Sequence, residues 1–405
     1  MASVFLSAPH RMMFFAGAVQ ALVAMLFWAF DLGARYADLY GAVTWGRPAV
    51  WLHGAVMLYG LFPLFIFGFL MTALPKWVSA PSLAPSCYQP AFFFLAGGWL
   101  LFWLGLALPL LQPLGLGLVL LGWVWGWSGL WRAVRWPQPA AFGVDRSHAY
   151  AILAALAIGA AGLLIYAWGM AAMAPGWVRS GIELGIWGFL LPIFFIVSHR
   201  MLPFFSGAVL KGYQVYRPMP LLWAMLGCFA AHGVLALAGL RVWLWLPDAA
   251  AAILAFHCSW KWQIRRALRV PMLAMLHVST LWLGLGLSLY VVQSLVLAAG
   301  GSWAGLAPLH AISIGYFASM LLGMATRVTL GHSGRAIAEG DKWTWPLFWL
   351  FQLIPLLRIA GEFFPVPGVL NLQWLAALGW LVVFGTWCWL HLGIYLRPRP
   401  DGQPG

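Results

Sequence analysis

Long apolar stretches alternate with short polar connections along the whole chain. A membrane-spanning helix needs about 20 apolar residues, and we count about twelve stretches of that length. Their centres lie near Leu22, Leu61, Trp99, Leu121, Leu156, Leu190, Cys228, Ile253, Leu283, Phe317, Phe351 and Val383. Two boundaries are weakly marked, one at 109–113 and one around Gly239 and Arg241. The pattern predicts an all-α fold, a polytopic transmembrane bundle of about twelve helices.

Composition supports this interpretation. Of the 405 residues, 63% are hydrophobic and 8% are charged, whereas a soluble domain carries about 25% charged residues. Most of the surface must therefore face lipid. The net charge of +13 does not indicate nucleic-acid binding, because the basic residues are spread over short connections between apolar stretches.

The basic residues also predict an orientation. If the chain starts in the cytoplasm, 17 of the 22 Lys and Arg residues fall on the cytoplasmic side. The 5 on the other side are Arg35, Arg47, Arg179, Arg241 and Arg358. This positive-inside bias places both termini in the cytoplasm. We expect a short cytoplasmic N-terminus at 1–12, one transmembrane bundle at 13–396 and a polar cytoplasmic tail at 397–405.

Few side chains in the predicted bundle could carry chemistry. The chain has nine acidic residues, and Asp248 is the one that falls well inside a predicted span. Proton-coupled transporters depend on buried carboxylates, so this scarcity weakens a transporter interpretation. The four cysteines are far apart and form no CxxC or CxxCH motif, which excludes a zinc knuckle and covalent c-type haem.

Histidine is the remaining residue type that could carry chemistry inside the predicted bundle, and the chain has ten histidines. The predicted topology places three in the outer half and five in the cytoplasmic half or on its surface. The outer group is His53, His232 and His310, and the cytoplasmic group is His148, His199, His257, His277 and His332.

His53 and His310 lie at similar predicted depth on the second and tenth helices. Two such imidazoles can bracket one haem iron as axial ligands, or each can hydrogen-bond a neighbouring helix. His310 and His332 are 22 residues apart, which is about 33 Å along a helix, so they cannot share a metal.

A stripe of small residues recurs every four positions on the tenth helix, at Ala311, Gly315, Ser319 and Gly323. Such a stripe lets a neighbouring helix or a flat cofactor approach closely. Helix packing is the interpretation we favour.

Several motifs resemble one family. The segment from His310 to Arg335 reads HAISIGYFASMLLGMATRVTLGHSGR, and MLHVSTLWLGLGL contains His277. The segment HRMLPFFS begins at His199, and WLHGAVMLYG contains His53. Together they resemble the NnrS family over nearly the whole chain. The resemblance implies a haem- and copper-containing protein of the bacterial inner membrane that takes part in the response to nitric oxide.

The second-helix motif departs from the family pattern. Aligned on Met57, His53 matches the first histidine, but Ala55 and Val56 stand where the family has a second histidine and a glutamate. This departure puts a copper site or proton-coupled chemistry there in doubt and leaves His53 as a haem ligand candidate.

A weaker resemblance reaches the catalytic subunit of haem-copper oxidases and nitric oxide reductases, in which helices two and ten hold a low-spin haem. The companion histidine on helix ten is absent, because position 312 is Ile312. The candidate metal ligands are His53, His310, His277, His199, His232 and His332. The differing depths of His232, His199 and His277 argue against one metal shared by all three.

Arg200, Arg327 and Arg335 lie at predicted cytoplasmic ends of helices, where the positive-inside rule alone explains them. Alternatively, these three arginines pair with haem carboxylates or with the loop that contains His332.

Two functions follow as hypotheses. The first is an NnrS-like membrane protein with haem b between helices two and ten, which binds, detoxifies or reduces nitric oxide; as an enzyme it would be an oxidoreductase with quinol as electron donor. The second is a small-solute transporter or channel with structural histidines. The sequence leaves copper content, enzymatic activity and oligomeric state open.

Overall fold

The computed structural model describes residues 2–137, 144–335 and 343–401, and these residues form helices without any strand. Within these described ranges, twelve helices are long and apolar enough to cross a membrane, which confirms the predicted polytopic bundle. The spans are Pro9–Arg35, Ala49–Trp77, Pro85–Leu104, Leu111–Val134, Ser147–Ala171, Pro175–Val209, Met219–Leu237, Arg241–Lys261, Pro271–Ala298, Ala307–His332, Thr344–Phe363 and Leu372–Tyr395.

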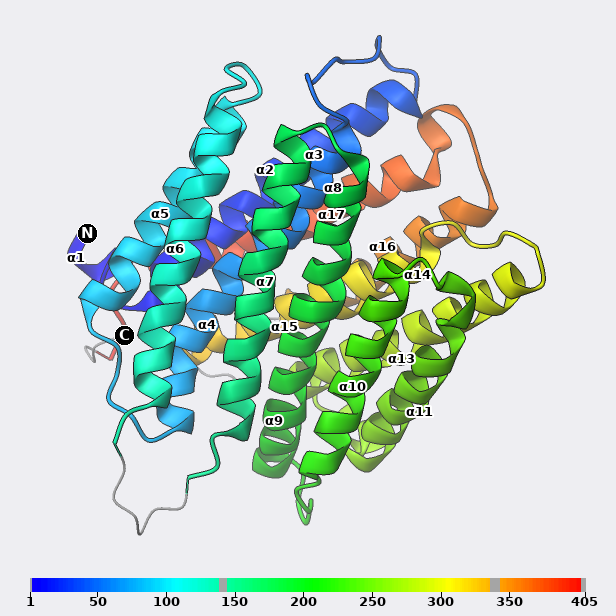
Figure 1. The fold of residues 1–405 in the computed structure, drawn as a ribbon. Coiled ribbons are helices and arrows are strands. Elements are labelled where there is room, and N and C mark those ends of the chain that lie inside the picture. Colours follow the sequence, from blue (N-terminus) through cyan, green and yellow to red (C-terminus); the bar gives the residue numbers. More distant parts are fainter. Residues whose placement is uncertain (1, 138–143, 336–342, 402–405) are drawn as a thin grey trace.

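Both ends of the chain lie at one face of the bundle, as Figure 1 shows. Arg11 near the start of the first span donates to the carbonyls of Tyr395 and Arg397 near the end of the last, at 3.2 and 2.9 Å. We call this the terminal face and the other the opposite face. The assignment of the terminal face to the cytoplasm stays a prediction from the charge distribution.

Spans 2, 6 and 10 form the centre of the bundle. Their most apolar windows are 83%, 61% and 78% buried, and no other span exceeds 56%. Each of the three contains a π-helical segment, an arrangement that is rare and often marks functional sites. The π segments are η1 (Val56–Leu61), η3 (Leu184–Leu190) and η5 (Ala311–Ala318). Every fourth helix is thus central, a periodicity that the sequence did not reveal.

Three phenylalanines pack against one another where the central spans meet. Phe62 follows η1, Phe194 follows η3, and Phe317 lies in η5. The ring centroids of Phe62 lie 5.7 Å from those of both Phe194 and Phe317, and the last two are 4.7 Å apart. We call this the phenylalanine layer.

The small-residue stripe of span 10 serves helix packing. A Cβ added at Gly315 would lie 2.5 Å from the Trp282 ring of α13 (Pro271–Ala298), and one at Gly323 would meet Met275 and Leu276. The glycines let α13 approach span 10 closely.

A glycine contact between α5 (Pro85–Leu104) and α6 (Leu111–Val134) offers a test of the packing. A Cβ at Gly98 would lie 2.6 Å from the carbonyl oxygen of Gly115, whereas one at Gly97 meets nothing within 4 Å. We expect Gly98→Val to destabilise the bundle by about 1–3 kcal/mol, the usual cost of overpacking. Thermal unfolding in detergent checks this, and an equal loss in Gly97→Val would contradict it.

Candidate functional site

His53 and His310 line the same cavity. Spans 1, 2, 10, 11 and 12 form its walls toward the opposite face, where α3 (Ala49–Ala55), α14 (Ala307–His310), α16 (Thr344–Phe363) and α17 (Leu372–Tyr395) gather in Figure 1. The cavity has a volume of about 70 Å³. It is lined by Met25, Trp28, His53, Met57, Leu58, Phe62, His310, Ser313, Ile314, Ile354, Arg358, Gln373, Ala376, Ala377 and Trp380.

The local structure brings the two histidines to equal depth. Each lies within the first turns of its span, counted from the opposite face, and each directly precedes or nearly precedes a π segment. A π segment adds one residue to a helical turn, so it re-aims the side chains around it relative to the rest of the helix. Spans 2 and 10 thus face the same cavity with their histidines.

Hydrogen bonding determines the tautomer of His310. Its Nδ1 lies 2.9 Å from the carbonyl oxygen of Leu306. A carbonyl can only accept, so Nδ1 carries the proton and Nε2 keeps a free lone pair. Metal-binding histidines are commonly oriented by this kind of bond. The Nε2 atom of His310 is therefore available to bind a metal ion.

His53 is held differently. Its ring stacks on Trp28, with 4.0 Å between centroids and 13° between planes. Its buried Nδ1 has no hydrogen-bond partner among the described residues. The other polar side chains at the cavity are those of Ser313, Gln373 and Arg358. A buried imidazole nitrogen without a partner is costly, so His53 is suited to a ligand that supplies one.

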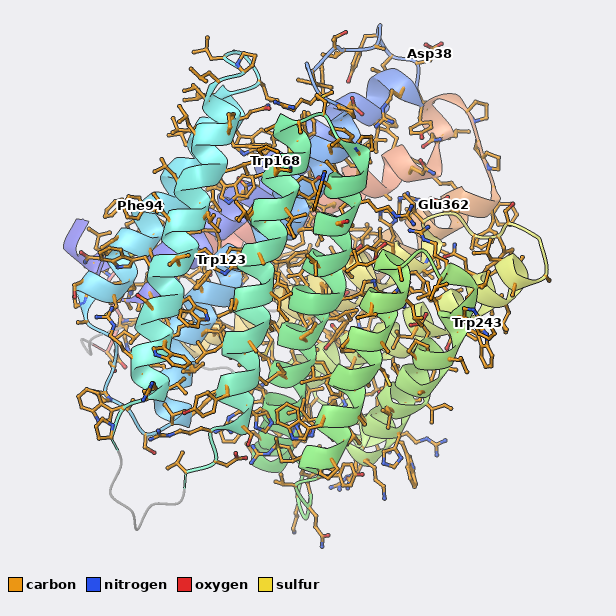
Figure 2. All side chains as sticks on the ribbon, viewed as in Figure 1. Asp38, Phe94, Trp123, Trp168, Trp243 and Glu362 are labelled. Atoms are coloured by element: carbon orange, nitrogen blue, oxygen red, sulfur yellow. The ribbon has the colours of Figure 1, made fainter. Side chains whose placement is uncertain are left out.

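Arg358 is the cation that lines this cavity, and it lies near its carboxylate partner Glu362, with 2.5 Å between Nη1 and Oε1. Figure 2 places Glu362 toward the same end of the molecule as Asp38, while Trp123 lies midway along the bundle. Sequence reasoning assigned Arg358 to the outer side without a role. A charged residue inside an apolar helix is itself a sign of a functional site, and this sign could have identified Arg358 from the sequence.

Two of the arginines that could pair with haem carboxylates lie elsewhere. Arg327 lies near the terminal end of span 10, with its guanidinium 3.8 Å from the ring centroid of Phe205. Arg335 follows the end of that span, where its N–H donates to the carbonyl of Leu330. Neither lines the cavity of His53 and His310, and their pairing with haem carboxylates stays a prediction.

His199 has both ring nitrogens engaged. Its Nε2 lies 3.2 Å from the carbonyl of Pro218 and must donate, so Nδ1 accepts from Nε2 of His148 at 3.0 Å. Nε2 of His277 lies 3.3 Å from Oγ of Ser206. These histidines connect helices near the terminal face. Their bonds are those of structural residues, and the structure does not bring the two together with His53 or His310.

His332 lies against His10 at the terminal face, with ring centroids 4.7 Å apart. Across the described residues, no group of three or more His, Cys, Asp or Glu side chains is placed to hold a metal ion. Each candidate ligand outside the cavity therefore contacts partners at its own place in the bundle, and these ligands do not gather at one metal site among the described residues.

His232 forms a pair that the sequence did not reveal. Its Nδ1 lies 2.7 Å from Oδ1 of Asp248, and both side chains are nearly inaccessible, at 2% and 1%. The ring of Trp187 in η3 stacks on His232, with 3.3 Å between centroids. The second carboxylate oxygen of Asp248 has no partner among the described residues. Sequence reasoning had noted both residues but had no means of joining them.

The fold and the site define a class: polytopic α-helical membrane proteins in which histidines from two central helices share a cavity. The chain belongs to the NnrS family, because the model of that family, described as NnrS protein, matches residues 4–399. The resemblance seen in the sequence is thereby confirmed. No curated protein matches the chain.

Proposed function

We propose that this protein is a membrane haem protein of the nitric oxide response, with one b-type haem held by His53 and His310 between spans 2 and 10. The observation that carries the proposal is the shared cavity, which brings two histidines 257 positions apart in the sequence to one space. Membership of the NnrS family supports it.

The residues present suit the cofactor. His310 offers Nε2, and His53 has an unsatisfied ring nitrogen, so two neutral imidazoles are available as axial ligands. Arg358 and Gln373 can bind haem carboxylates. A porphyrin is larger than the cavity of about 70 Å³. Its entry requires lining side chains to move, and Met25 and Met57 are unbranched and adaptable enough to do so.

When bound, ferrous haem would supply an iron that takes nitric oxide as a ligand in place of one of the two histidines. The chain's own residues would position that iron and exclude water from it: Trp28 orients His53, and apolar side chains such as Ile354 and Ala377 line the walls. For a turnover reaction we expect membrane quinol as electron donor, because the chain has no CxxCH motif for c-type haem. We assign no copper site.

Reduced-minus-oxidised absorption spectra test the proposal. In the purified protein we expect a low-spin b-type signal that His53→Ala and His310→Ala each remove or alter. His257→Ala is the matched control, because His257 is a partly buried histidine near the terminal face that contacts Tyr216. A protein without any Soret band under reducing conditions would refute the proposal and favour the transporter alternative.

A further inference from the structure

A second cavity, lined only by apolar side chains, lies among the three central spans. Its volume is about 60 Å³. Span 2 contributes Phe65 and Leu70, span 6 contributes Ile193, and span 10 contributes Met320 and Met324. Phe194 of the phenylalanine layer also lines this cavity, which shares no lining residue with the cavity of His53 and His310.

The cavity leaves apolar volume unfilled among the central spans. Protein interiors are close-packed, and unfilled volume forfeits dispersion contacts. Ala325, which lines the cavity and is 2% exposed, leaves room that a larger apolar residue would fill. The central spans elsewhere use large aromatic side chains, as in the phenylalanine layer.

The phenylalanine layer separates this cavity from the cavity of His53 and His310, which we call the histidine cavity. Phe194 lines the apolar cavity and Phe62 lines the histidine cavity. Their ring centroids are 5.7 Å apart, in edge-to-face contact. The two spaces are therefore one layer of rings apart.

Three of the lining side chains, those of Phe69, Val197 and Val328, are only partly buried. On span 10, Val328 lies 11 residues beyond Phe317 toward the terminal face, which is about 16 Å along a helix. The cavity thus reaches away from the phenylalanine layer toward a region accessible from outside.

We propose that the apolar cavity binds a small uncharged gas molecule and leads it through the Phe62–Phe194 contact to the histidine cavity. Apolar cavities of modest size stay free of water and bind small apolar guests such as xenon. That the guest is nitric oxide rests on the proposed function; that the cavity holds a gas molecule does not.

Xenon is the probe for the cavity itself. In crystals of the protein under xenon pressure, we expect anomalous density between Phe65, Ile193 and Met324. Met324→Trp and the smaller change Ala325→Leu should each remove that density. Val292→Trp is the matched control, because Val292 is exposed on α13 and does not line the cavity. Absence of xenon in the wild type, or density from a lipid or detergent chain there, would overturn the proposal.

Nitric oxide rebinding after photolysis tests the route. We expect Met324→Trp and Ala325→Leu to slow bimolecular rebinding to the reduced haem several-fold with an unchanged haem spectrum, and Val292→Trp to leave it unchanged. Unchanged rates in both cavity variants would overturn the route. Xenon bound in a preparation without haem would uphold the gas site even if the haem proposal failed.

Discussion

Replacing His310 by alanine is expected to abolish haem binding, whereas replacing His53 by alanine leaves the haem bound with one open axial position. The asymmetry follows from how each imidazole ring is held in place. Nδ1 of His310 donates to the carbonyl of Leu306, which fixes the ring and raises the basicity of Nε2. Nδ1 of His53 has no such partner in the described part of the chain, so its orientation depends on stacking against Trp28.

Haem content per protein and exogenous imidazole distinguish the two variants. In His53→Ala we expect near-complete haem content, a high-spin ferric spectrum and restoration of the low-spin spectrum by added imidazole. In His310→Ala we expect haem content to fall to the background of the preparation, and imidazole to restore little. Equal haem loss in both variants would contradict the asymmetry while leaving the pairing of the two ligands intact.

The second large effect concerns stability. His232→Leu leaves the Asp248 carboxyl group, 1% exposed, without its hydrogen-bond partner, and a buried polar group left unsatisfied costs about 1–3 kcal/mol, and more while it is charged. Asp248→Leu leaves a neutral imidazole lacking one hydrogen bond, which costs about 1–3 kcal/mol. The double variant buries no unpaired polar group, so we expect it to be more stable than His232→Leu.

Reversible denaturation in mixed micelles measures these differences. Arg241→Ala is the control, because Arg241 pairs with Glu183 at 3.4 Å near the opposite face and is 45% exposed. Such exposed pairs contribute about 0–1 kcal/mol. A double variant no more stable than His232→Leu would show that the loss arises from packing against Trp187 and not from the unpaired carboxylate.

Much of the fold was predictable because the bilayer constrains it so strongly. Every backbone polar group in lipid must be satisfied within a helix, so apolar length alone identified the spans, including those on either side of Gly239. Position along each span then sorted the histidines. His53, His310 and His232 lie toward the opposite face, and His199, His277 and His332 lie toward the terminal face.

The contacts that could not be predicted depend on how each helix is rotated about its own axis and on which helices pack against one another. Hydropathy reports that a residue is in a span but not which helix it faces. Arg358 was therefore left without a site, and Asp248 was noted without its histidine.

By itself, the sequence determined the class of the fold, its twelve spans, the halves in which the histidines lie and the family to which the chain belongs. Only the tertiary structure decided that His53 and His310 share a cavity, that His232 pairs with Asp248, and that a layer of phenylalanines separates two cavities. The physical reason is that depth is encoded locally, in the length and polarity of each segment. Proximity across the bundle arises from side-chain packing between helices far apart in the chain, and the local pattern does not contain it.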